Sequence, residues 1–483
     1  MGKKSKQGLT VKKDEDFSEW FTQLIQKADL ADYTDVSGCI VFKPRIWAVW
    51  EKIRDEIDNR LKPMNVKNVY FPMLIPEKFL AQEASHVEGF APEVAWVTHA
   101  GETKLNERLA IRPTSEAIMY PSFSKWVRSW RDLPQKYNQW SNVIRWEFKH
   151  ATPLMRTREF VFNEGHTVFA TEKDALAEQK PIINMYTDIC ENYLALPFYF
   201  GKKSEKEKFA GAVFTVSMEF LLPNGKAAQG PDFHHDGQNF AKAYDIKFKD
   251  EKENEQYVWQ NTWAISTRML GIMVMIHSDD KGLVMPPKLA PEQVVIIPIL
   301  FDDSKDKVLK KAIEIKEKLE KSGVTAFIDD RTDYSPGWKF NEWELKGIPI
   351  RLELGPRDLA NNSVMMARRD TGDKKAVSIK DVDKEVVTEM DSMQKALLRN
   401  AKKMLKNSTV DAKDWKEFMK SVKEGKIVNS YFCGSVECEE VIKDKSGGAK
   451  TLNMPLKQPD VKGKKCVQCG KSAKFLFRFG KSY

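Results

Sequence analysis

The sequence lacks any apolar run long enough to cross a membrane. Its longest apolar stretches, near Met269–Ile276 and Val294–Leu300, fall well short of the roughly 20 residues that a membrane helix needs. No apolar segment follows the opening MGKKSKQG, so we expect no secretory signal. With 42% hydrophobic and 11% aromatic residues in 483, the chain can still bury sizeable cores. These features predict a cytoplasmic, globular protein of several domains without a membrane partner.

Several catalytic signatures are also missing. No G-x-S-x-G elbow or Cys–His nucleophile pattern is present, so covalent catalysis has no support. Gly470-Lys471-Ser472 and Gly480-Lys481-Ser482 resemble the end of a P-loop, but the glycine required five positions earlier is absent from both. His234-His235-Asp236 is disfavoured as a metal site, because adjacent residues of a strand point to opposite faces. The net charge of +9 permits a polyanionic partner without requiring one.

Cysteine is scarce, with six residues in the chain. Cys39 and Cys190 are isolated, and we expect them to be buried as small hydrophobes. The other four form two short-spaced pairs, C-x4-C and C-x2-C, at Cys433, Cys438, Cys466 and Cys469. In a reducing compartment this spacing favours a structural zinc over disulfides, with ordinary free thiols as the alternative.

The remaining pattern divides the chain into domains. Residues 1–15 are lysine-rich and predict a mobile extension, and residues 16–287 mix short strands with helices such as the amphipathic one that begins at Pro44. The proline-rich run VMPPKLAPEQ ends this region, and strand–helix alternation over residues 288–388 then predicts a compact α/β domain. Residues 389–483 would form a charged helical linker and the cysteine-bearing module.

One segment suggests a binding function. From Asn138 to Phe169 two alternating stretches predict a hairpin, with Arg145 and Arg156 near its mouth and Phe160 beside them. Paired guanidinium groups suit phosphate oxygens, and an aromatic ring can stack on a base. Taken alone, the hairpin could equally be a surface element with Arg–Glu ion pairs.

Taken together, these motifs resemble those of class II aminoacyl-tRNA synthetases, specifically the prolyl-tRNA synthetases of the archaeal and eukaryotic-like type. The helix from Pro44 into NVYFPMLIP resembles motif 1, the hairpin resembles motif 2, and NTWAISTRMLGIMVMIH with Arg268 resembles motif 3. RPTSEA at 112–117 matches the family's Thr-x-Glu loop, and PGWKFNEWELKGIPIRLELGPRDL matches its anticodon-binding domain. The resemblance implies an α+β catalytic core, an antiparallel sheet flanked by helices, with an α/β anticodon-binding domain and a small C-terminal zinc-binding module.

The resemblance also implies a reaction and its residues. Proline and ATP would give prolyl-adenylate, and the prolyl group would then pass to the 3′-terminal adenosine of proline tRNA. Arg145 and Arg268 would be catalytic, because the proline carboxylate is already an ionised nucleophile and the enzyme has only to align and stabilise charge. The implied ATP-binding residues are Arg145, Glu147, Arg156, Thr157, Phe160, Gln229 and Arg268. The implied proline-binding residues are Thr114, Glu116, Arg145, Phe162, Glu164, His166, His234 and Ser266.

Further expectations come from the same source. ATP would bind with magnesium, although Gln260 and Asn261 occupy a region where many class II enzymes carry carboxylates. Asp232 also departs from the usual pattern, and its role stays open. We expect a homodimer, no editing domain in cis, and a C-terminal Tyr483 that returns to the core. Candidates for reading the anticodon are charged residues of the α/β domain, namely Lys339, Glu342, Glu344, Lys346 and Arg351.

Three rival hypotheses remain. A related class II synthetase for another amino acid would need a different pocket around Thr114, Glu116 and His234. A non-catalytic, synthetase-like RNA-binding regulatory protein should have lost motif arginines, yet all three are present. A free-standing enzyme of amino-acid metabolism would leave the domain after residue 288 unexplained.

Overall fold

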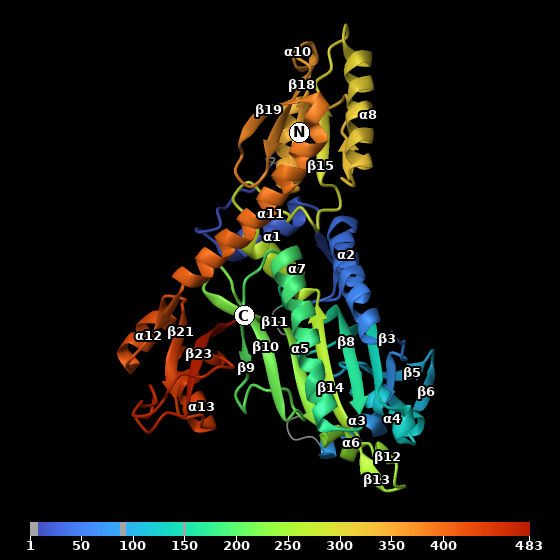
Figure 1. The fold of residues 1–483 in the computed structure, drawn as a ribbon, viewed down its shortest axis with the longest axis vertical. Coiled ribbons are helices and arrows are strands. Elements are labelled where there is room, and N and C mark those ends of the chain that lie inside the picture. The colour runs from blue at the N-terminus through green and yellow to red at the C-terminus, as the bar shows by residue number, and fades with distance from the viewer. Residues whose placement is uncertain (1–7, 87–92, 148–150) are drawn as a thin grey trace.

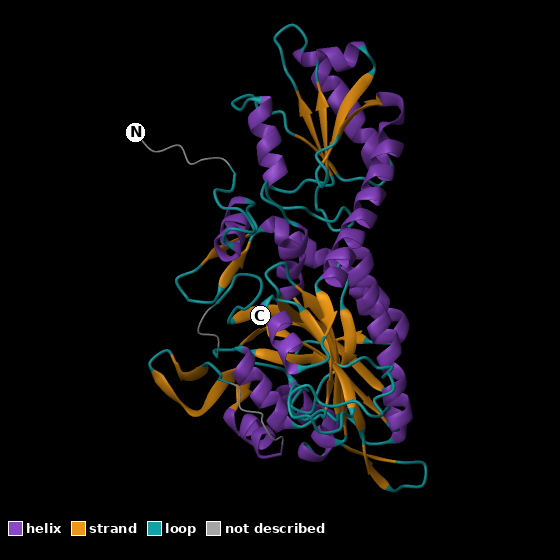
Figure 2. Ribbon diagram, turned by 90° about the vertical axis from the view of Figure 1, so that its left-hand side faces the viewer, coloured by secondary structure: helices purple, strands orange, loops and turns teal. Residues whose placement is uncertain are grey.

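The computed structural model describes residues 8–86, 93–147 and 151–483. A large sheet with flanking helices forms the lower body, and a smaller α/β domain lies above it (Figures 1 and 2). The long helix α11, Val382–Asn407, runs from the upper domain down to the C-terminal module, as Figure 1 shows. No helix in the described part of the chain is long and apolar enough to cross a membrane.

Helix α2, Pro44–Leu61, begins where the sequence predicts. Proline suits the first turn of a helix because its missing N–H would have no intrahelical partner there. The predicted apolar stripe is buried, with Ile46, Ile53 and Ile57 inaccessible to solvent. The helix therefore packs against the core along one continuous face, which confirms the periodicity.

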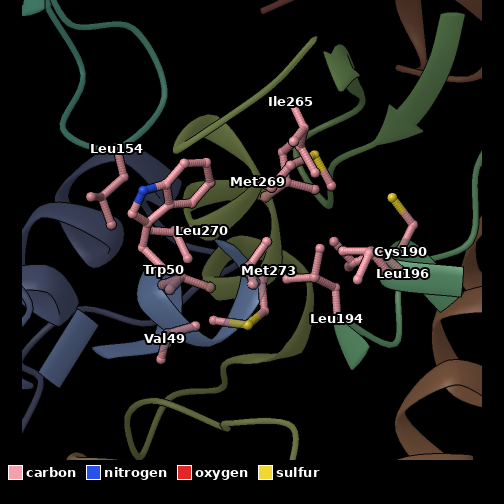
Figure 3. Close-up of a cluster of buried hydrophobic side chains, with 14 of the residues drawn as sticks. Val49, Trp50, Leu154, Cys190, Leu194, Leu196, Ile265, Met269, Leu270 and Met273 are labelled. Atoms are coloured by element: carbon pink, nitrogen blue, oxygen red, sulfur yellow. The ribbon is translucent and has the colours of Figure 1, made fainter. Parts of the chain in front are cut away.

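Helix α7, Arg268–His277, is buried from Met269 to Met275. Figure 3 shows Met269, Leu270 and Met273 among side chains from α2 and from the segment around Cys190. A helix that is apolar on all sides can lie only inside a domain. Its first residue, Arg268, is thus held rigidly at the edge of the core.

Within the described residues, eleven strands form the main sheet. Hydrogen-bonded neighbours follow the order β20-β21-β23-β11-β14-β8-β7-β3. In addition, β10 pairs with β11, β9 pairs with β10, and β22 pairs with β23. The strands are β3 (Lys67–Asn68), β7 (Gln135–Ile144), β8 (Glu159–Phe169), β9 (Tyr199–Lys202), β10 (Phe214–Leu221), β11 (Lys226–Gly237), β14 (Trp259–Ser266), β20 (Thr409–Asp411), β21 (Ile427–Phe432), β22 (Ala449–Asn453) and β23 (Phe475–Ser482). Strands β7 and β8 confirm the predicted hairpin.

The sheet differs from expectation in two ways. It is mixed and not purely antiparallel, because β3 runs parallel to β7, β11 to β23 and β20 to β21. The C-terminal module is also continuous with the catalytic sheet, since β23 pairs with β11 through Lys226 and Ala227. The backbone N–H of Tyr483 donates to the Ala227 carbonyl at 2.8 Å, so the last residue lies against the core.

Other elements cover this sheet or extend it. Helix α5 packs on β8, β11 and β14, and a short π-helix (Ile189–Tyr193) continues it. The remaining elements of the lower body are α1 (Phe17–Lys27), β1 (Ala31–Tyr33), β2 (Ile40–Phe42), a 3₁₀ turn (Lys62–Met64), β4 (Leu74–Pro76), α3 (Glu77–His86), β5 (Trp96–Ala100), β6 (Thr103–Ile111), α4 (Glu116–Trp126), a second 3₁₀ turn (Trp130–Asp132), α5 (Glu172–Asp188), α6 (Asn239–Ala243), β12 (Lys247–Lys249) and β13 (Glu255–Tyr257).

The upper domain confirms the predicted α/β alternation. Its sheet has the order β16-β15-β17-β18-β19, with β15 parallel to β16 and β17 and the last two strands antiparallel. One face of its first helix is buried, through Val308, Ala312, Ile315 and Leu319, which recur at helical spacing. The elements are β15 (Val294–Pro298), α8 (Lys305–Lys321), β16 (Ala326–Ile328), α9 (Pro336–Leu345), β17 (Ile350–Leu354), α10 (Pro356–Ala360), β18 (Ser363–Arg368), β19 (Lys374–Ser378) and a 3₁₀ turn (Ile379–Asp381).

The two ends of the chain have further contacts. Residues 1–7 of the expected mobile extension lie outside the described residues, whereas Lys13 donates from its backbone N–H to Asp280 at 2.7 Å and from Nζ to the Ser278 carbonyl at 2.7 Å. The C-terminal module adds α12 (Trp415–Lys423) and α13 (Val436–Ser446) to its strands. Cys190 is buried as predicted, but Cys39 is only half-buried, because it lies in the exposed connection before β2.

Candidate active site

A cavity of about 250 Å³ opens on one face of the main sheet. Strand register builds it: Phe162, Glu164 and His166 of β8 lie opposite Ser266, Ala264 and Thr262 of β14, and Asp232 and His234 of β11 lie opposite Ala264 and Thr262. Because side chains alternate along a strand, residues two apart share a face. The register therefore brings side chains from three strands to one wall.

Two carboxyl groups form the deep end of this cavity. The Thr114 hydroxyl lies within hydrogen-bond distance of both Glu116 and Glu164, at 3.1 Å from Glu164 Oε1. Glu164 also accepts from the backbone N–H of Ser115 at 3.1 Å and from its hydroxyl. Burial, and then the charge of Glu116, raise the pKa of Glu164 to about 7, and burial raises the pKa of Glu116 too. No basic side chain within the described residues forms an ion pair with either carboxylate at 4 Å or less. A cationic ligand would supply the missing partner.

Arginines lie toward the other end. Arg145 Nε donates to the Pro113 carbonyl at 3.1 Å, and its guanidinium lies 5.4 Å from the centre of the Phe160 ring. Arg268 donates from Nε to the Met155 carbonyl at 3.0 Å and from Nη1 to the Gln229 carbonyl at 3.3 Å. Burial, and then the positive charge of Arg145, lower the pKa of Arg268. The charges of Asp232 and Glu219 act in the opposite direction and partly offset the repulsion between the arginines.

The position of Arg268 reinforces this reading. It begins α7, whose N-terminus carries partial positive charge and has no side-chain cap. A cation is unfavourable at a helix N-terminus, and a bound anion would offset that cost. The arrangement therefore fits a phosphate-bearing ligand.

The two histidines of the pocket are neutral. Burial lowers the pKa of His166 to about 3, and it also lowers the pKa of His234. His234 stacks on Phe209 with ring centres 4.6 Å apart, and its Nδ1 lies 2.8 Å from the Thr215 hydroxyl. His235 points to the other side of the strand, toward Asn261, as the sequence argument predicts.

A second cavity, of about 200 Å³, adjoins the first and shares Glu207, Gln229 and Arg268 with it. Arg156 and Tyr483 line this second cavity and not the first. Thr157 is buried and donates to the Glu159 carbonyl at 2.6 Å, and Glu147 is exposed at the end of β7. These last two predicted residues line neither cavity.

The other predicted residues do converge. The first cavity is lined by Thr114, Glu116, Arg145, Phe160, Phe162, Glu164, His166, Gln229, His234, Ser266 and Arg268, together with Asp232. Asp232 accepts from Gln229 Nε2 at 2.7 Å and lies 3.4 Å from His234 Nε2. It therefore sits between the arginine end and the histidine.

The four cysteines also converge, in the C-terminal module. Their Sγ atoms all lie within 4.8 Å of one another, and those of Cys433 and Cys469 are 3.9 Å apart. A tetrahedral ion with sulfur ligands at about 2.3 Å places them about 3.8 Å apart. Burial raises the pKa of Cys438 to about 12 in the metal-free protein. This donor set suits a metal that favours thiolates.

Comparison with known proteins agrees with this geometry. Family models match at residues 98–277 (tRNA synthetase class II core domain (G, H, P, S and T)), 293–389 (anticodon binding domain) and 415–483 (prolyl-tRNA synthetase, C-terminal). A cytoplasmic proline–tRNA ligase of Arabidopsis thaliana is 45% identical over 99% of this chain and 91% of its own length. The chain belongs to the prolyl-tRNA synthetase family.

Other relatives of the family match over their whole length. Proline–tRNA ligase 2 of Bacillus thuringiensis subsp. konkukian is 45% identical, with 100% of both chains covered. The crystal structure of the prolyl-tRNA synthetase from Cryptosporidium parvum, complexed with halofuginone and AMPPNP, superposes with a TM-score of 0.95. It is 44% identical, and the match covers 99% of each chain.

Within the anticodon-binding domain of this synthetase, one predicted residue is unsuitable for contacting RNA. Lys339 is only 2% exposed, and its Nζ donates to the Asp329 carbonyl at 2.9 Å. Glu342 accepts from Arg331 and Lys346, and Arg351 pairs with Glu353 at 2.9 Å. The sequence could not show this, because a charged residue on a helix has the same pattern whether it faces solvent or a buried partner.

The synthetase pocket also contains residues that the sequence did not single out. These are Glu207, Phe209, Thr215 and Thr262. Glu207 and Phe209 lie in the charged run KKSEKEKFAGA, which looks like a solvated loop. Thr262 could have been found, because it lies four positions before Ser266 in an alternating strand.

Proposed function

We propose that the chain activates L-proline with ATP and transfers the prolyl group to the 3′-terminal adenosine of proline tRNA. One observation carries the assignment to this cavity: two buried carboxyls with raised pKa values lie at one end, and arginines whose charges repel each other lie at the other. An amino acid joined to a phosphate chain presents the opposite charges in the same order. The regulatory-protein alternative is not favoured, since it predicts the loss of these charges.

Proline occupies the carboxyl end. Its secondary ammonium binds Thr114, Glu116 and Glu164, which provide a hydroxyl and two acceptors. The ring packs in a slot formed by Phe162, His166, His234 and Ser266, where neutral histidines avoid repelling the ammonium. Burying a small ring in such a slot contributes about 2 kcal/mol.

ATP occupies the arginine end. Arg145 binds the α-phosphate and the proline carboxylate, Arg268 binds the γ-phosphate, and Phe160 stacks on the adenine. Gln229, from the shared wall of the two cavities, and Arg156, from the second cavity, complete the phosphate side. Thr157 orders the hairpin through its contact with the Glu159 carbonyl, and exposed Glu147 is free to contact the nucleotide.

These residues need no general base. The proline carboxylate attacks the α-phosphorus already ionised, so the protein contributes alignment and stabilisation of the developing charge. Magnesium bound to the phosphates would add further charge neutralisation. Asp232 contacts Gln229 and His234, so it lies between the proposed ATP and proline positions.

Zinc is the proposed occupant of the four-cysteine cluster. Four thiolates leave no open position for a substrate, so the ion would be structural. Metal analysis of purified protein should find about one zinc per chain, and Cys469→Ser should lower that content. Full zinc content in that variant would contradict the assignment.

Three further expectations belong to the same proposal. The protein acts in the cytoplasm as a homodimer, with the exposed apolar residues Tyr70, Met73 and Leu74 near the motif 1 segment as the expected contact. The segment between β8 and β14 consists of strands of the core sheet, helices and the small β12–β13 hairpin, which supports the absence of a cis editing domain. Anticodon reading would fall to the α/β domain.

Proline-dependent ATP–pyrophosphate exchange tests the assignment. The unmodified protein should catalyse exchange, and Arg145→Ala should reduce kcat/KM by about 100- to 1,000-fold. Arg128→Ala changes an exposed arginine outside the cavity and is the matched control. Robust exchange in Arg145→Ala would overturn the mechanism.

A further inference from the structure

The segment from Ser204 to Phe209 forms part of the pocket wall, yet residues of the C-terminal module hold it in place. Glu207 lines both cavities, and Phe209 lines the first cavity while stacking on His234. The backbone N–H of Phe209 donates to the Thr215 hydroxyl at 2.9 Å, and the same hydroxyl contacts His234. The segment therefore sets the position of one side of the proposed proline slot.

Ser204 is the point at which this segment is attached. Its hydroxyl donates to Glu439 Oε1 at 2.8 Å, and it accepts from the backbone N–H of Glu207 at 3.2 Å. The Ser204 carbonyl accepts from the backbone N–H of Lys208 at 3.0 Å. One buried side chain thus fixes the turn that carries both Glu207 and Phe209.

Glu439 belongs to α13 and follows Cys438 directly. It is 6% exposed, and the Thr451 hydroxyl donates to the same carboxylate oxygen as Ser204. The backbone N–H of Cys438 donates to the Ser435 hydroxyl at 3.2 Å and its thiol to Gln468 Oε1 at 3.0 Å, so the first turn of α13 is held at two points. A carboxylate in this setting has a defined position from which to hold Ser204.

A second, weaker attachment runs alongside. Lys450 Nζ donates to Glu207 Oε2 at 3.3 Å, and Lys206 forms an ion pair with Glu440. The Glu440 side chain is 51% exposed, so its pair contributes little. The buried link through Glu439 is the one that should matter.

We propose that Glu439 is a positioning residue for the amino-acid pocket, holding the Ser204–Phe209 segment so that Phe209 closes against His234. The carboxylate lies outside the pocket and acts through Ser204. The C-terminal module therefore acts indirectly on amino-acid binding, besides its expected structural role. This inference rests on the proposed assignment of the cavity to proline.

Glu439→Ala tests this role, because it should raise KM for proline and leave KM for ATP nearly unchanged. Loss of two buried hydrogen bonds should release the segment and raise KM for proline about tenfold in ATP–pyrophosphate exchange. KM for ATP should change less than twofold, because the arginines are attached to other elements. Glu439→Gln keeps an acceptor oxygen of the same shape and should restore KM for proline to within about threefold of the unmodified protein.

Glu440→Ala is the matched control, since it changes the adjacent residue of the same helix. It should leave both KM values within about twofold. The Tm and the zinc content of every variant should also be measured. A merely structural defect would raise KM for both substrates, and the rise would be larger in variants with a lower Tm.

If Glu439→Ala fails to fold, Ser204→Ala removes the same link from the other side and should give the same selective rise. An unchanged KM for proline in a folded variant of either kind would overturn the inference, as would equal rises for both substrates. Absence of proline-dependent exchange in the unmodified protein would instead refute the proposed function, so the two failures are distinguishable.

Discussion

Two buried groups of charged residues in this protein have opposite character. In the catalytic pocket, Glu116 and Glu164 lie together, and burial with like charge raises the pKa of Glu164 to about 7. In the anticodon-binding domain, Asp329 is equally buried, but Arg331 donates to it from Nε at 2.8 Å and from Nη2 at 2.7 Å. Burial alone would raise its pKa, yet the hydrogen bonds from Arg331 and Trp343 and the charge of Lys339 lower it to about 2.

The difference separates a binding site from a structural support. A buried carboxylate is costly unless it is neutralised, paired or bound by a ligand. The Asp329 group has its partners within the chain, which is the arrangement expected of a structural support. Glu116 and Glu164 accept hydrogen bonds but form no ion pair at 4 Å or less with any described residue, and the charges of Arg112 and Arg145 only partly offset their burial, so a bound cation would stabilise both carboxylates.

Breaking the paired group should have the largest effect. Asp329→Asn leaves Lys339 buried opposite a neutral amide and should destabilise the anticodon-binding domain by about 3–5 kcal/mol. Urea unfolding followed by tryptophan fluorescence measures it, because Trp343 Nε1 donates to Asp329 at 2.8 Å. The exposed neighbour change Asp330→Asn is the control, and a loss below about 1 kcal/mol would show that the group is not a structural support.

Removing a charge from the Glu116–Glu164 pair should not lower stability, in contrast to the change at Asp329. Glu164→Gln removes one of two like charges, so the free protein should keep or raise its Tm. The same change should raise KM for proline about 10- to 100-fold, because a charge-assisted hydrogen bond is lost. Glu102→Gln, in an exposed turn, is the control. A lowered Tm together with an unchanged KM for proline in Glu164→Gln would show that Glu164 supports the fold and does not bind proline.

The pH dependence sharpens the contrast. The pKa of Glu164 is raised from 4.5 to about 7, so the folded chain holds a proton that the unfolded chain has lost between these values. Stability from this group is therefore greatest at low pH and declines up to about pH 7. Proline needs the ionised form, so its affinity should rise about tenfold from pH 6 to pH 8.

Calorimetry in buffers of different ionisation enthalpy checks this prediction. At pH 6 proline binding should release close to one proton, and Glu164→Gln should bind without that release. Proton release that persists in the variant would assign the titration to another group.

The smallest effect should come from a partly exposed pair. Lys346 Nζ donates to Glu342 at 2.8 Å, and the lysine side chain is 25% exposed. Pairs of this kind contribute about 0.5 kcal/mol or less. Lys346→Ala should therefore leave the urea midpoint of the domain nearly unchanged, and a loss above about 2 kcal/mol would mean that Lys346 belongs to the buried group.

Much of the fold followed from local pattern. Helix α2 begins at Pro44 and buries the predicted face, and the alternating phenylalanines Phe475, Phe477 and Phe479 lie on β23. Period and turn chemistry are local properties, so they can be read without a structure. The motif arginines and the Thr-x-Glu loop were likewise found from sequence, and most of them line one cavity.

What local pattern could not supply was the identity of neighbours across the sheet. Glu207 and Phe209 looked like part of a solvated run, and Lys339 looked like a free surface charge. The environment of Glu207 and Phe209 depends on β11 and on the C-terminal module, which follow later in the chain, and that of Lys339 depends on how Asp329 is buried beneath α9. Arg156, expected beside Arg145, lines the adjoining cavity instead.

By itself, the sequence determined the elements, the order of the domains and the types of residue available for chemistry, because each depends on spacing along the chain. Only the tertiary structure decided which buried charges were paired and which were left for a ligand. It also decided that the C-terminal module extends the catalytic sheet and reaches the pocket wall. Pairing and register are set by long-range packing, which one chain's periodicity does not specify.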